Sequence, residues 1–339
     1  MSRLTPYLEQ HKKFEGPGDA RPSAIQVVED QDLVGKWAGK VALVTGCSPG
    51  GLGPETARAL HVTGADVYIT VRDVAKGEEV AKDILSDGKP GKVEVIKLDL
   101  GSLDSVRQGA KEFLSKSEKL NVLVNNAGLY LHSASGKTVD GFETQFGTNH
   151  LGHFLLFQLL KPALLAAATP EFNSRVVSVS STGHRQGKIQ FEDFNFDSKI
   201  EYQPWAAYGQ SKLANILFAN EIDRRYGPKG IHAFSLNPGG IKTPLQRYAP
   251  ELQKMIERPE VQLFLKSTSQ GAATSVWAAV AKELEGLGGK YLENVGVAEQ
   301  AAPDVGPGGP GYIAPAFDPP TEKKLWVESL KLVGLEDDA

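Results

Sequence analysis

A tyrosine and a lysine stand four residues apart in the run Tyr208-Gly-Gln-Ser-Lys212. On an α-helix this spacing places both side chains on one face. Because a neighbouring ammonium favours the phenolate, we expect Lys212 to lower the pKa of Tyr208 towards the range in which a phenol exchanges a proton at neutral pH. The pair occurs by chance in many helices, so a catalytic role needs further support.

Ser181 directly follows the apolar run Ser174-Arg-Val-Val-Ser-Val-Ser180, which we predict to be a β-strand. In open α/β sheets, binding sites form at the carboxyl ends of the strands. The Ser181 hydroxyl is therefore a candidate to hold a substrate oxygen.

A glycine-rich turn, Thr45-Gly-Cys-Ser-Pro-Gly-Gly-Leu-Gly53, follows the apolar run 40–45 and precedes a predicted helix that begins at Pro54. Glycines at this place let backbone amides approach a pyrophosphate at the positive end of the helix. A tight turn without a ligand is the alternative, but the position after the first strand favours dinucleotide binding. The residues expected to contact the dinucleotide are Gly46, Ser48, Gly51, Leu52 and Gly53.

Cys47 lies within this turn, close to the N-terminus of the predicted helix. A helix N-terminus lowers the pKa of a thiol, so a redox role is one interpretation. The interpretation that we favour is a small residue that packs beside the nucleotide.

The end of the second predicted strand, residues 66–71, bears on the choice of cofactor. Sites that prefer NAD place a carboxylate there for the ribose hydroxyls, whereas this sequence has Val71 followed by Arg72. A guanidinium binds a 2′-phosphate through paired, charge-assisted hydrogen bonds, so the sequence favours NADP. A solvated Arg72 is the alternative, and Asp73, one position further, leaves NAD open.

Composition limits the class of protein. The 339 residues include 37 Lys and Arg against 41 Asp and Glu, and this near balance argues against a nucleic-acid-binding protein. Cys47 is the single cysteine, which rules out an internal disulfide and a cysteine-based zinc site; no metal is expected. The sequence shows neither an apolar signal segment nor a run of about 18 apolar residues, so we expect a cytoplasmic protein.

Predicted strands and helices alternate along most of the chain. This order predicts a doubly wound parallel sheet of the Rossmann type, in one domain over residues 38–339. Residues 1–38 are expected to be an arm that lies on the domain or is partly disordered, and 301–320 an irregular surface segment. The predicted strands are 40–45, 66–71, 92–98, 121–124, 174–180 and 232–236, and the predicted helices are 54–61, 74–87, 102–116, 143–168, 206–226 and 269–280.

Over residues 38–300 the sequence resembles the short-chain dehydrogenase/reductase family. The runs 146–154 and 206–218 resemble its retinol-dehydrogenase-like branch, which includes proteins similar to the WW-domain oxidoreductase. The other matching pieces are the turn 45–53, Asp99 in Leu98-Asp-Leu100, Asn125-Asn-Ala-Gly128, Asn149, Ser181, Tyr208 with Lys212, and Pro238-Gly239.

The resemblance implies a role for each of these residues. Tyr208 would be the acid/base, Lys212 would hold the nicotinamide ribose and tune Tyr208, and Ser181 would orient the substrate oxygen. Asn149 would hold a water that extends the proton path through Lys212. The further cofactor contacts that the resemblance implies are Asp99, Leu100, Asn126, Ala127, Gly128, Pro238, Gly239, Ile241 and Thr243.

Two features depart from the family pattern. Four residues separate Gly46 from Gly51, one more than usual, so Ser48 could reach the 2′-phosphate instead of the pyrophosphate. The polar segment 1–38 stands where retinol dehydrogenases usually carry a membrane anchor, which argues against a membrane-bound retinoid enzyme.

Two loops are expected to wall the substrate pocket. These are 182–205, for which hydrophobic anchoring is the alternative, and 244–266, which follows the Pro238 motif. His184 in the first loop either enters the pocket or stays within the loop. His150 and His153 are expected to be helix-packing or interface residues rather than metal ligands.

The predicted helices 143–168 and 206–226 are apolar on more than one face. In the family these helices pair across a two-fold axis, which predicts a homodimer. Deep burial within a monomer is the alternative explanation.

The leading functional prediction is an NADP(H)-dependent enzyme that interconverts a carbonyl and an alcohol on a fairly apolar small molecule. One alternative is a catalytically silent regulatory or scaffold protein that binds a dinucleotide. Another is a non-redox family member, such as an epimerase or dehydratase. The intact set of Ser181, Tyr208 and Lys212 favours an enzyme, because a scaffold needs no matched proton donor.

Overall fold

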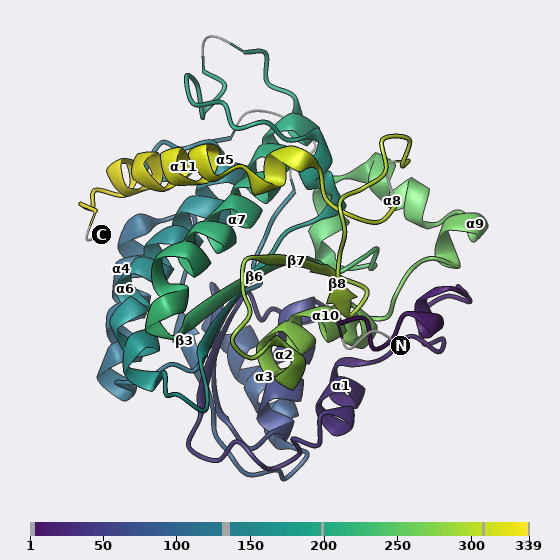
Figure 1. The fold of residues 1–339 in the computed structure, drawn as a ribbon, viewed down its shortest axis with the longest axis vertical. Coiled ribbons are helices and arrows are strands. Elements are labelled where there is room, and N and C mark those ends of the chain that lie inside the picture. The colour runs from purple at the N-terminus through teal and green to yellow at the C-terminus, as the bar shows by residue number, and fades with distance from the viewer. Residues whose placement is uncertain (1–3, 131–135, 198–199, 307–308, 338–339) are drawn as a thin grey trace.

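The computed structural model describes residues 4–130, 136–197, 200–306 and 309–337. Over these residues the chain forms a twisted sheet with helices on both faces (Figure 1). Residues 1–3 of the predicted arm and 198–199 of the predicted loop 182–205 lie outside these ranges.

Within the described ranges, eight strands pair in the order β3-β2-β1-β4-β5-β6-β7-β8. All neighbouring strands are parallel except β7 and β8, so the predicted doubly wound sheet is confirmed. The sequence did not predict β7 and β8. The strands are β1 Val41–Thr45, β2 Asp66–Val71, β3 Val93–Lys97, β4 Val122–Asn125, β5 Ser174–Val179, β6 Ile231–Asn237, β7 Lys290–Glu293 and β8 Gly296–Val297.

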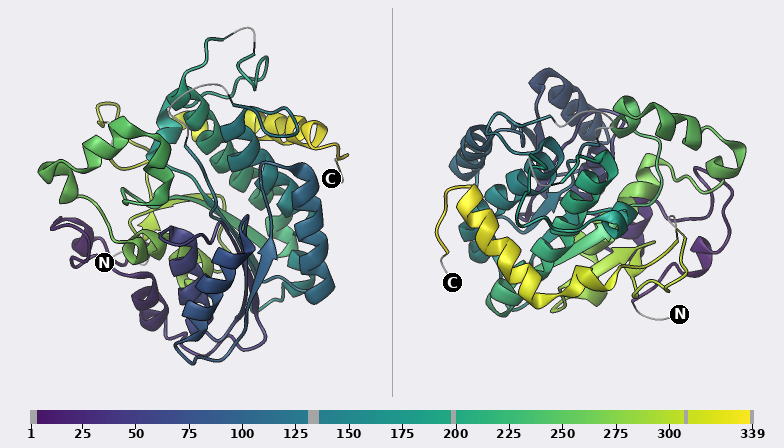
Figure 2. Two further views of the ribbon diagram at one scale, coloured as in Figure 1. Left: turned by 180° about the vertical axis from the view of Figure 1, so that it is seen from behind. Right: turned by 90° about the horizontal axis from the view of Figure 1, so that it is seen from above.

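Helices cover both faces of the sheet (Figure 2). One layer consists of α1 Ala24–Asp30, α2 Leu52–Val62, α3 Val74–Leu85 and α10 Thr268–Val280. The other consists of α4 Leu103–Lys116, α6 Gly152–Ala167, α7 Pro204–Tyr226 and α11 Pro319–Leu332. Along β1, Val44 packs towards the first of these helix layers and Leu43 towards the second. Burial on both faces explains why the strands are nearly continuous apolar runs.

The predicted helix 143–168 is interrupted near its start. α5 (Thr144–Phe146) continues through a π-helical turn, Gly147–Leu151, into α6. A Cβ atom at Gly152 would lie 2.5 Å from the carbonyl oxygen of Leu100, so glycine permits this close contact. The stretch Thr144–Ala167 is long and apolar enough to cross a membrane, but 72% of its most apolar window is buried within the protein. It is therefore best described as a core helix.

Two histidines of this segment are buried and hydrogen-bonded. The Nε2 atom of His150 lies 2.9 Å from Ser329 Oγ on α11, and that of His153 lies 2.9 Å from Thr45 Oγ1 at the end of β1. Burial lowers the pKa of His150 to about 3 and that of His153 to about 4. The predicted packing role of both side chains is confirmed.

α11 covers the helix faces on which the homodimer prediction was based. Its buried Trp326 packs against the rings of Phe154, Phe157 and Phe218, which belong to α6 and α7. These apolar residues are therefore buried within one chain, as the alternative explanation expected. The homodimer itself stays a prediction, which these residues no longer support.

The described part of the N-terminal arm packs on the domain. Val27 and Val28 of α1 are fully buried against α10 and α2, and Trp37 also belongs to this core. The sequence did not predict α1, because charged residues, Pro and Gly hide its short apolar face. α8 (Pro250–Ile256) and α9 (Pro259–Gln262) lie in the predicted loop 244–266.

Replacing Trp326 with Ala is expected to lower the free energy of unfolding by about 3–5 kcal/mol, because it leaves a large cavity between α11, α6 and α7. Urea denaturation of both proteins measures the loss. Trp205→Ala is the control, because Trp205 is 41% exposed and its removal should cost less than about 1 kcal/mol. Similar losses in the two variants would contradict the structural role of α11.

Acid should destabilise the protein partly through His153. The pKa of His153 is about 4 in the folded protein, below the 6.5 of a free histidine, so its stabilising contribution is full above pH 6.5 and is lost as the pH falls towards 4. Between pH 7 and pH 5 this loss amounts to about 2 kcal/mol. Urea unfolding at both pH values should therefore show a smaller decrease for His153→Gln than for the wild type; equal decreases would refute the assignment.

Candidate active site

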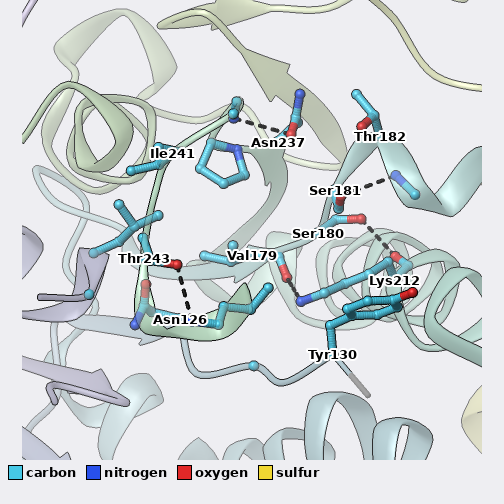
Figure 3. Close-up of a pocket in the computed structure, with 18 of the residues that line it drawn as sticks. Asn126, Tyr130, Val179, Ser180, Ser181, Thr182, Lys212, Asn237, Ile241 and Thr243 are labelled. Carbon is cyan, nitrogen blue, oxygen red and sulfur yellow. Dashed lines mark hydrogen bonds between the residues drawn. The ribbon is translucent and has the colours of Figure 1, made fainter. Parts of the chain in front are cut away.

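A cavity of about 2250 Å³ lies at the edge of the sheet where the parallel strands end (Figure 3). Parallel strands bring their carboxyl ends to one edge, so segments far apart in sequence meet there. Among the predicted site residues, Asn149 and Gly53 do not line this cavity. Those that do are Gly46, Ser48, Gly51, Leu52, Arg72, Asp99, Leu100, Asn126, Ala127, Gly128, Ser181, Tyr208, Lys212, Pro238, Gly239, Ile241 and Thr243.

Thr45 joins the glycine-rich turn to the end of β4. Its hydroxyl accepts hydrogen bonds from the backbone N–H groups of Asn126 and Ala127, each at 3.0 Å. The Asn126 side-chain amide donates to the Thr45 carbonyl oxygen at 2.7 Å. Gly46 has a φ of +72°, and a Cβ atom there would lie 2.7 Å from the Ala127 Cβ atom. The close approach of these two segments therefore requires glycine at position 46.

The additional residue of the turn is accommodated just before α2. Gly50 has a φ of +76°, and Gly51 is the N-cap of the helix. A Cβ atom at Gly53 would lie 2.6 Å from the Gly46 carbonyl oxygen, so Gly53 lets the helix pack on the turn rather than facing the cavity. Cys47 is fully buried, and burial raises the pKa of its thiol. The redox interpretation of Cys47 is therefore wrong, and the packing interpretation fits.

Two cations line the cavity beyond the end of β2. Arg72 is exposed there, and Lys76 of α3 also lines the cavity. Asp73, which left NAD open, caps α3: its carboxylate accepts a hydrogen bond from the Lys76 backbone N–H at 3.4 Å and lies 3.7 Å from the Lys76 Nζ atom. Lys76 was not predicted, although its position four residues after Arg72 on a predicted helix was visible in the sequence.

Three hydrogen bonds fasten α7 to the end of β5. The Lys212 ammonium and the Asn215 amide both donate to the Val179 carbonyl oxygen, each at 3.1 Å. The Ser180 hydroxyl donates to the Lys212 carbonyl oxygen at 2.7 Å (Figure 3). These bonds hold Tyr208, one turn earlier on α7, at the edge of the sheet.

The Tyr208 and Ser181 side chains both line the cavity, and the interaction between them acts to lower the pKa of Tyr208. Burial has the larger effect and raises that pKa to about 12. The Lys212 Nζ atom lies 5.6 Å from the centre of the Tyr208 ring, and burial lowers the pKa of Lys212 to about 8. The expected lowering of the Tyr208 pKa is therefore wrong for this structure, because desolvation of the phenol outweighs the distant ammonium. At neutral pH Tyr208 is a proton donor.

Asn149 lies in the π-helical turn and holds the segment that follows β4. Its amide oxygen accepts a hydrogen bond from the Leu129 N–H at 2.9 Å, and its NH₂ group donates to the Leu129 carbonyl oxygen and to the Ser211 hydroxyl, each at 3.0 Å. A Cβ atom at the neighbouring Gly128 would lie 3.2 Å from the Lys212 Nζ atom. The side chain thus positions the cavity wall near Lys212, and its water-mediated role stays a prediction.

Aromatic side chains surround Tyr208. Tyr130 lies 5.3 Å from the Tyr208 ring and 4.7 Å from the Trp205 ring, between centroids, and Leu245 and Leu252 pack on the same cluster. Segments of both predicted loops, 182–205 and 244–266, line the cavity. Tyr130 was missed, although it stands just two residues after the Asn-Asn-Ala-Gly run.

His184 stays within its loop. Its Nδ1 atom lies 2.6 Å from the Ser181 carbonyl oxygen, and the ring is fully buried outside the cavity lining. Burial lowers its pKa to about 4. Of the two predicted places for His184, the structure shows the loop.

The comparison with known proteins agrees with this geometry. The family described as short chain dehydrogenase matches residues 40–254. The chain is 50% identical over 336 residues to the short-chain dehydrogenase/reductase prx1 of Penicillium roqueforti, covering 98% of this chain and 94% of that protein. It is 45% identical over 258 residues to retinol dehydrogenase 12 of Mus musculus, covering 76% and 78% of the two chains.

A solved structure shows the same fold. An uncharacterized protein from Mycobacterium paratuberculosis is 35% identical, with a TM-score of 0.66 over 88% of this chain and 95% of that one. The family resemblance seen in the sequence is therefore confirmed, together with the nicotinamide dinucleotide that the family implies. The chain belongs to the short-chain dehydrogenase/reductase family of oxidoreductases and is similar to its retinol dehydrogenases.

Proposed function

We propose that this protein is an NADP(H)-dependent oxidoreductase that interconverts a carbonyl and an alcohol on a fairly apolar small molecule. The observation that carries the proposal is the meeting of Tyr208, Ser181 and Lys212 at the wall of one large cavity. Tyr208 and Lys212 lie on α7, and Ser181 lies just after β5; the hydrogen bonds to Val179 hold α7 against this strand end.

Ser181, Tyr208 and Lys212 each have a separate role in orienting the substrate oxygen and transferring the proton. The dinucleotide, when bound, supplies the hydride for reduction or accepts it in oxidation. Ser181 hydrogen-bonds the substrate oxygen and orients it towards Tyr208. Tyr208, protonated at neutral pH because burial raises its pKa to about 12, donates the proton that the reduced oxygen needs. Lys212, with a pKa of about 8, exchanges protons more readily than an ordinary lysine and sits next to this path.

The cavity has the features that a phosphorylated dinucleotide needs. Glycines at 46, 50 and 51 let the backbone approach a pyrophosphate at the start of α2. Arg72 and Lys76 place two positive charges at the end of β2, where a 2′-phosphate would lie, with Ser48 nearby on the cavity wall. Asp73 caps α3, lies 3.7 Å from the Lys76 ammonium and lines the same cavity. The exposed guanidinium of Arg72, which follows Val71 rather than a carboxylate, supports NADP over NAD.

The substrate end of the cavity is mostly apolar. Tyr130, Trp205, Leu245, Leu252 and Met255 all line it, together with Ser181 and Tyr208. An apolar molecule with one reacting oxygen fits this distribution. A cytoplasmic location stays a prediction, drawn from the sequence alone.

Tyr208→Phe removes the proton donor and should lower kcat/KM by about 10²–10⁴-fold while leaving NADPH affinity nearly unchanged. NADPH oxidation with a panel of ketones and aldehydes measures the rate, and NADPH fluorescence measures binding. Tyr202→Phe is the matched control, because that phenol contacts Glu143 and Gln145 away from the cavity lining.

Full activity of Tyr208→Phe would refute the catalytic assignment. A wild type that binds NADPH but converts nothing in a broad panel would favour a silent binding protein. Substrate conversion without net cofactor turnover would identify a non-redox enzyme.

Arg72→Ala should raise the Kd for NADPH by about 10–100-fold, because a charge-assisted pair with the 2′-phosphate is lost, and should change the Kd for NADH by less than about threefold. Isothermal titration with both nucleotides measures the difference. Lys82→Ala removes an exposed cation from the outer part of the same α3 helix and serves as the control. Equal small losses for both nucleotides in Arg72→Ala would contradict the NADP assignment.

A further inference from the structure

Large apolar side chains are exposed where the first part of the N-terminal arm meets the loop 244–266. From here on, the arm means residues 4–22 only, and the lid means residues 244–266. Leu8 and Phe14 of the arm are 50% and 39% exposed, and Met255 and Phe264 of the lid are 42% and 56% exposed. All four line the cavity. Exposed apolar side chains that line a cavity indicate a surface that binds an apolar molecule.

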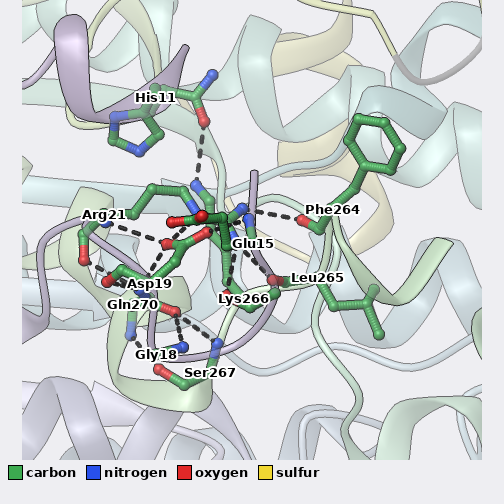
Figure 4. Close-up of polar contacts among 12 residues, drawn as sticks. His11, Glu15, Gly18, Asp19, Arg21, Phe264, Leu265, Lys266, Ser267 and Gln270 are labelled. Atoms are coloured by element: carbon green, nitrogen blue, oxygen red, sulfur yellow. Dashed lines mark hydrogen bonds and ion pairs between the residues drawn. The ribbon is translucent and has the colours of Figure 1, made fainter. Parts of the chain in front are cut away.

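A buried arginine joins the arm to the lid. Arg21 is 3% exposed, and its guanidinium donates hydrogen bonds to the carbonyl oxygens of Phe264 at 2.9 Å and Leu265 at 2.6 Å (Figure 4). It also donates to the Gly16 carbonyl oxygen at 3.1 Å and pairs with the Asp19 carboxylate at 2.7 Å. The single guanidinium of Arg21 thus binds two arm residues and two lid residues.

Further contacts make this junction specific. The Gly16 N–H donates to the Leu263 carbonyl oxygen at 2.9 Å, and the rings of Phe14 and Phe264 lie 4.9 Å apart. Gln270, in the first turn of α10, accepts a hydrogen bond from the Gly18 N–H at 2.9 Å and donates to the Arg21 carbonyl oxygen at 3.0 Å (Figure 4). The end of the lid is therefore held between the arm and α10.

Lys266, at the end of the lid, connects this junction to the wall of the cavity. Lys266 follows Leu265, is 4% exposed, and donates to Asn294 Oδ1 at 3.0 Å; its backbone N–H donates to the Gly240 carbonyl oxygen at 2.9 Å. A Cβ atom at Gly239 would lie 3.2 Å from the Lys266 Nζ atom. The position of the lid end is thus coupled directly to the Pro238–Thr243 segment beside the proposed reaction site.

We propose that the arm and the lid together form a binding site for the extended apolar chain of the substrate, and that Arg21 is the positioning residue that holds this site together. Leu8, Phe14, Met255 and Phe264 would contact the chain, while Ser181 and Tyr208 act on its oxygen. The inference rests on the proposed function and adds the substrate class: a long-chain aldehyde, ketone or alcohol. Figure 1 shows the arm beneath α9, on the side of the molecule where the lid projects.

Arg175 offers a matched control within the same chain. It is 2% exposed, donates to the carbonyl oxygens of Ala278 at 3.2 Å and Ala281 at 2.8 Å, and pairs with Glu285 at 2.8 Å. This is the same chemistry at the end of α10, outside the cavity lining. A lysine in place of either arginine keeps the charge but loses the planar fork, so both variants weaken a buried junction.

The test compares wild type, Arg21→Lys, Leu8→Ala and Arg175→Lys. The first readout is the ratio of kcat/KM for decanal to that for hexanal, measured by NADPH oxidation. Each methylene that the site buries should raise kcat/KM by up to about fourfold in the wild type. We expect this ratio to fall by about tenfold in Arg21→Lys and by about fourfold in Leu8→Ala, and to stay constant in Arg175→Lys.

The second readout does not depend on turnover. Hydrogen exchange of residues 258–266 is measured in the NADPH complex with and without 1-decanol. Decanol should protect this segment in wild type and Arg175→Lys and fail to do so in Arg21→Lys.

Equal decanal-to-hexanal ratios in all four proteins, or no protection by decanol in the wild type, would overturn the proposal. If decanol protects the lid but no alkanal is reduced, the proposed reaction fails while the arm–lid site stands.

Discussion

The fastening of α7 to the end of β5 is the constraint on which the candidate site depends. The Val179 carbonyl oxygen accepts hydrogen bonds from both Lys212 and Asn215, and Ser180 bonds the Lys212 carbonyl oxygen from the same strand end. These bonds are buried, where an unpaired donor is costly, so the helix has little freedom to slide along the strand. The Tyr208 phenol on α7 and the Ser181 hydroxyl, two residues after the end of β5, thereby stay close together.

A second connection fixes the cofactor half of the cavity relative to this one. Thr45, at the end of β1, bonds to Asn126 and Ala127 after β4 and to His153 of α6. Asn149, four residues before His153, holds Leu129 and bonds Ser211 of α7. The glycine-rich turn and the tyrosine helix are therefore linked through buried hydrogen bonds that cross the ends of β1, β4 and β5. Such a frame can present a cofactor and an acid/base group in fixed relative positions.

Much of the fold could be predicted because buried parallel strands such as β1 are nearly uninterrupted apolar runs between amphipathic helices. α1 and α11 were missed because each follows a segment rich in Pro and Gly, and α11 is stabilised by tertiary contacts such as those of Trp326. In the site, spacing indicated Tyr208, Lys212 and Ser181, but not the balance between burial and charge that raises the pKa of Tyr208. The junction at Arg21 was beyond prediction, since its partners lie more than 240 residues away.

The most direct test of the central claim is a crystal structure of the protein with NADP⁺ and a bound alcohol. We expect a nicotinamide ring between Ser181 and the Gly239–Thr243 segment, with the Tyr208 hydroxyl about 2.6–3.2 Å from the alcohol oxygen. α7 should keep its bonds to the Val179 carbonyl oxygen in that complex. A nicotinamide bound elsewhere, or a Tyr208 hydroxyl turned away from the alcohol, would contradict the account.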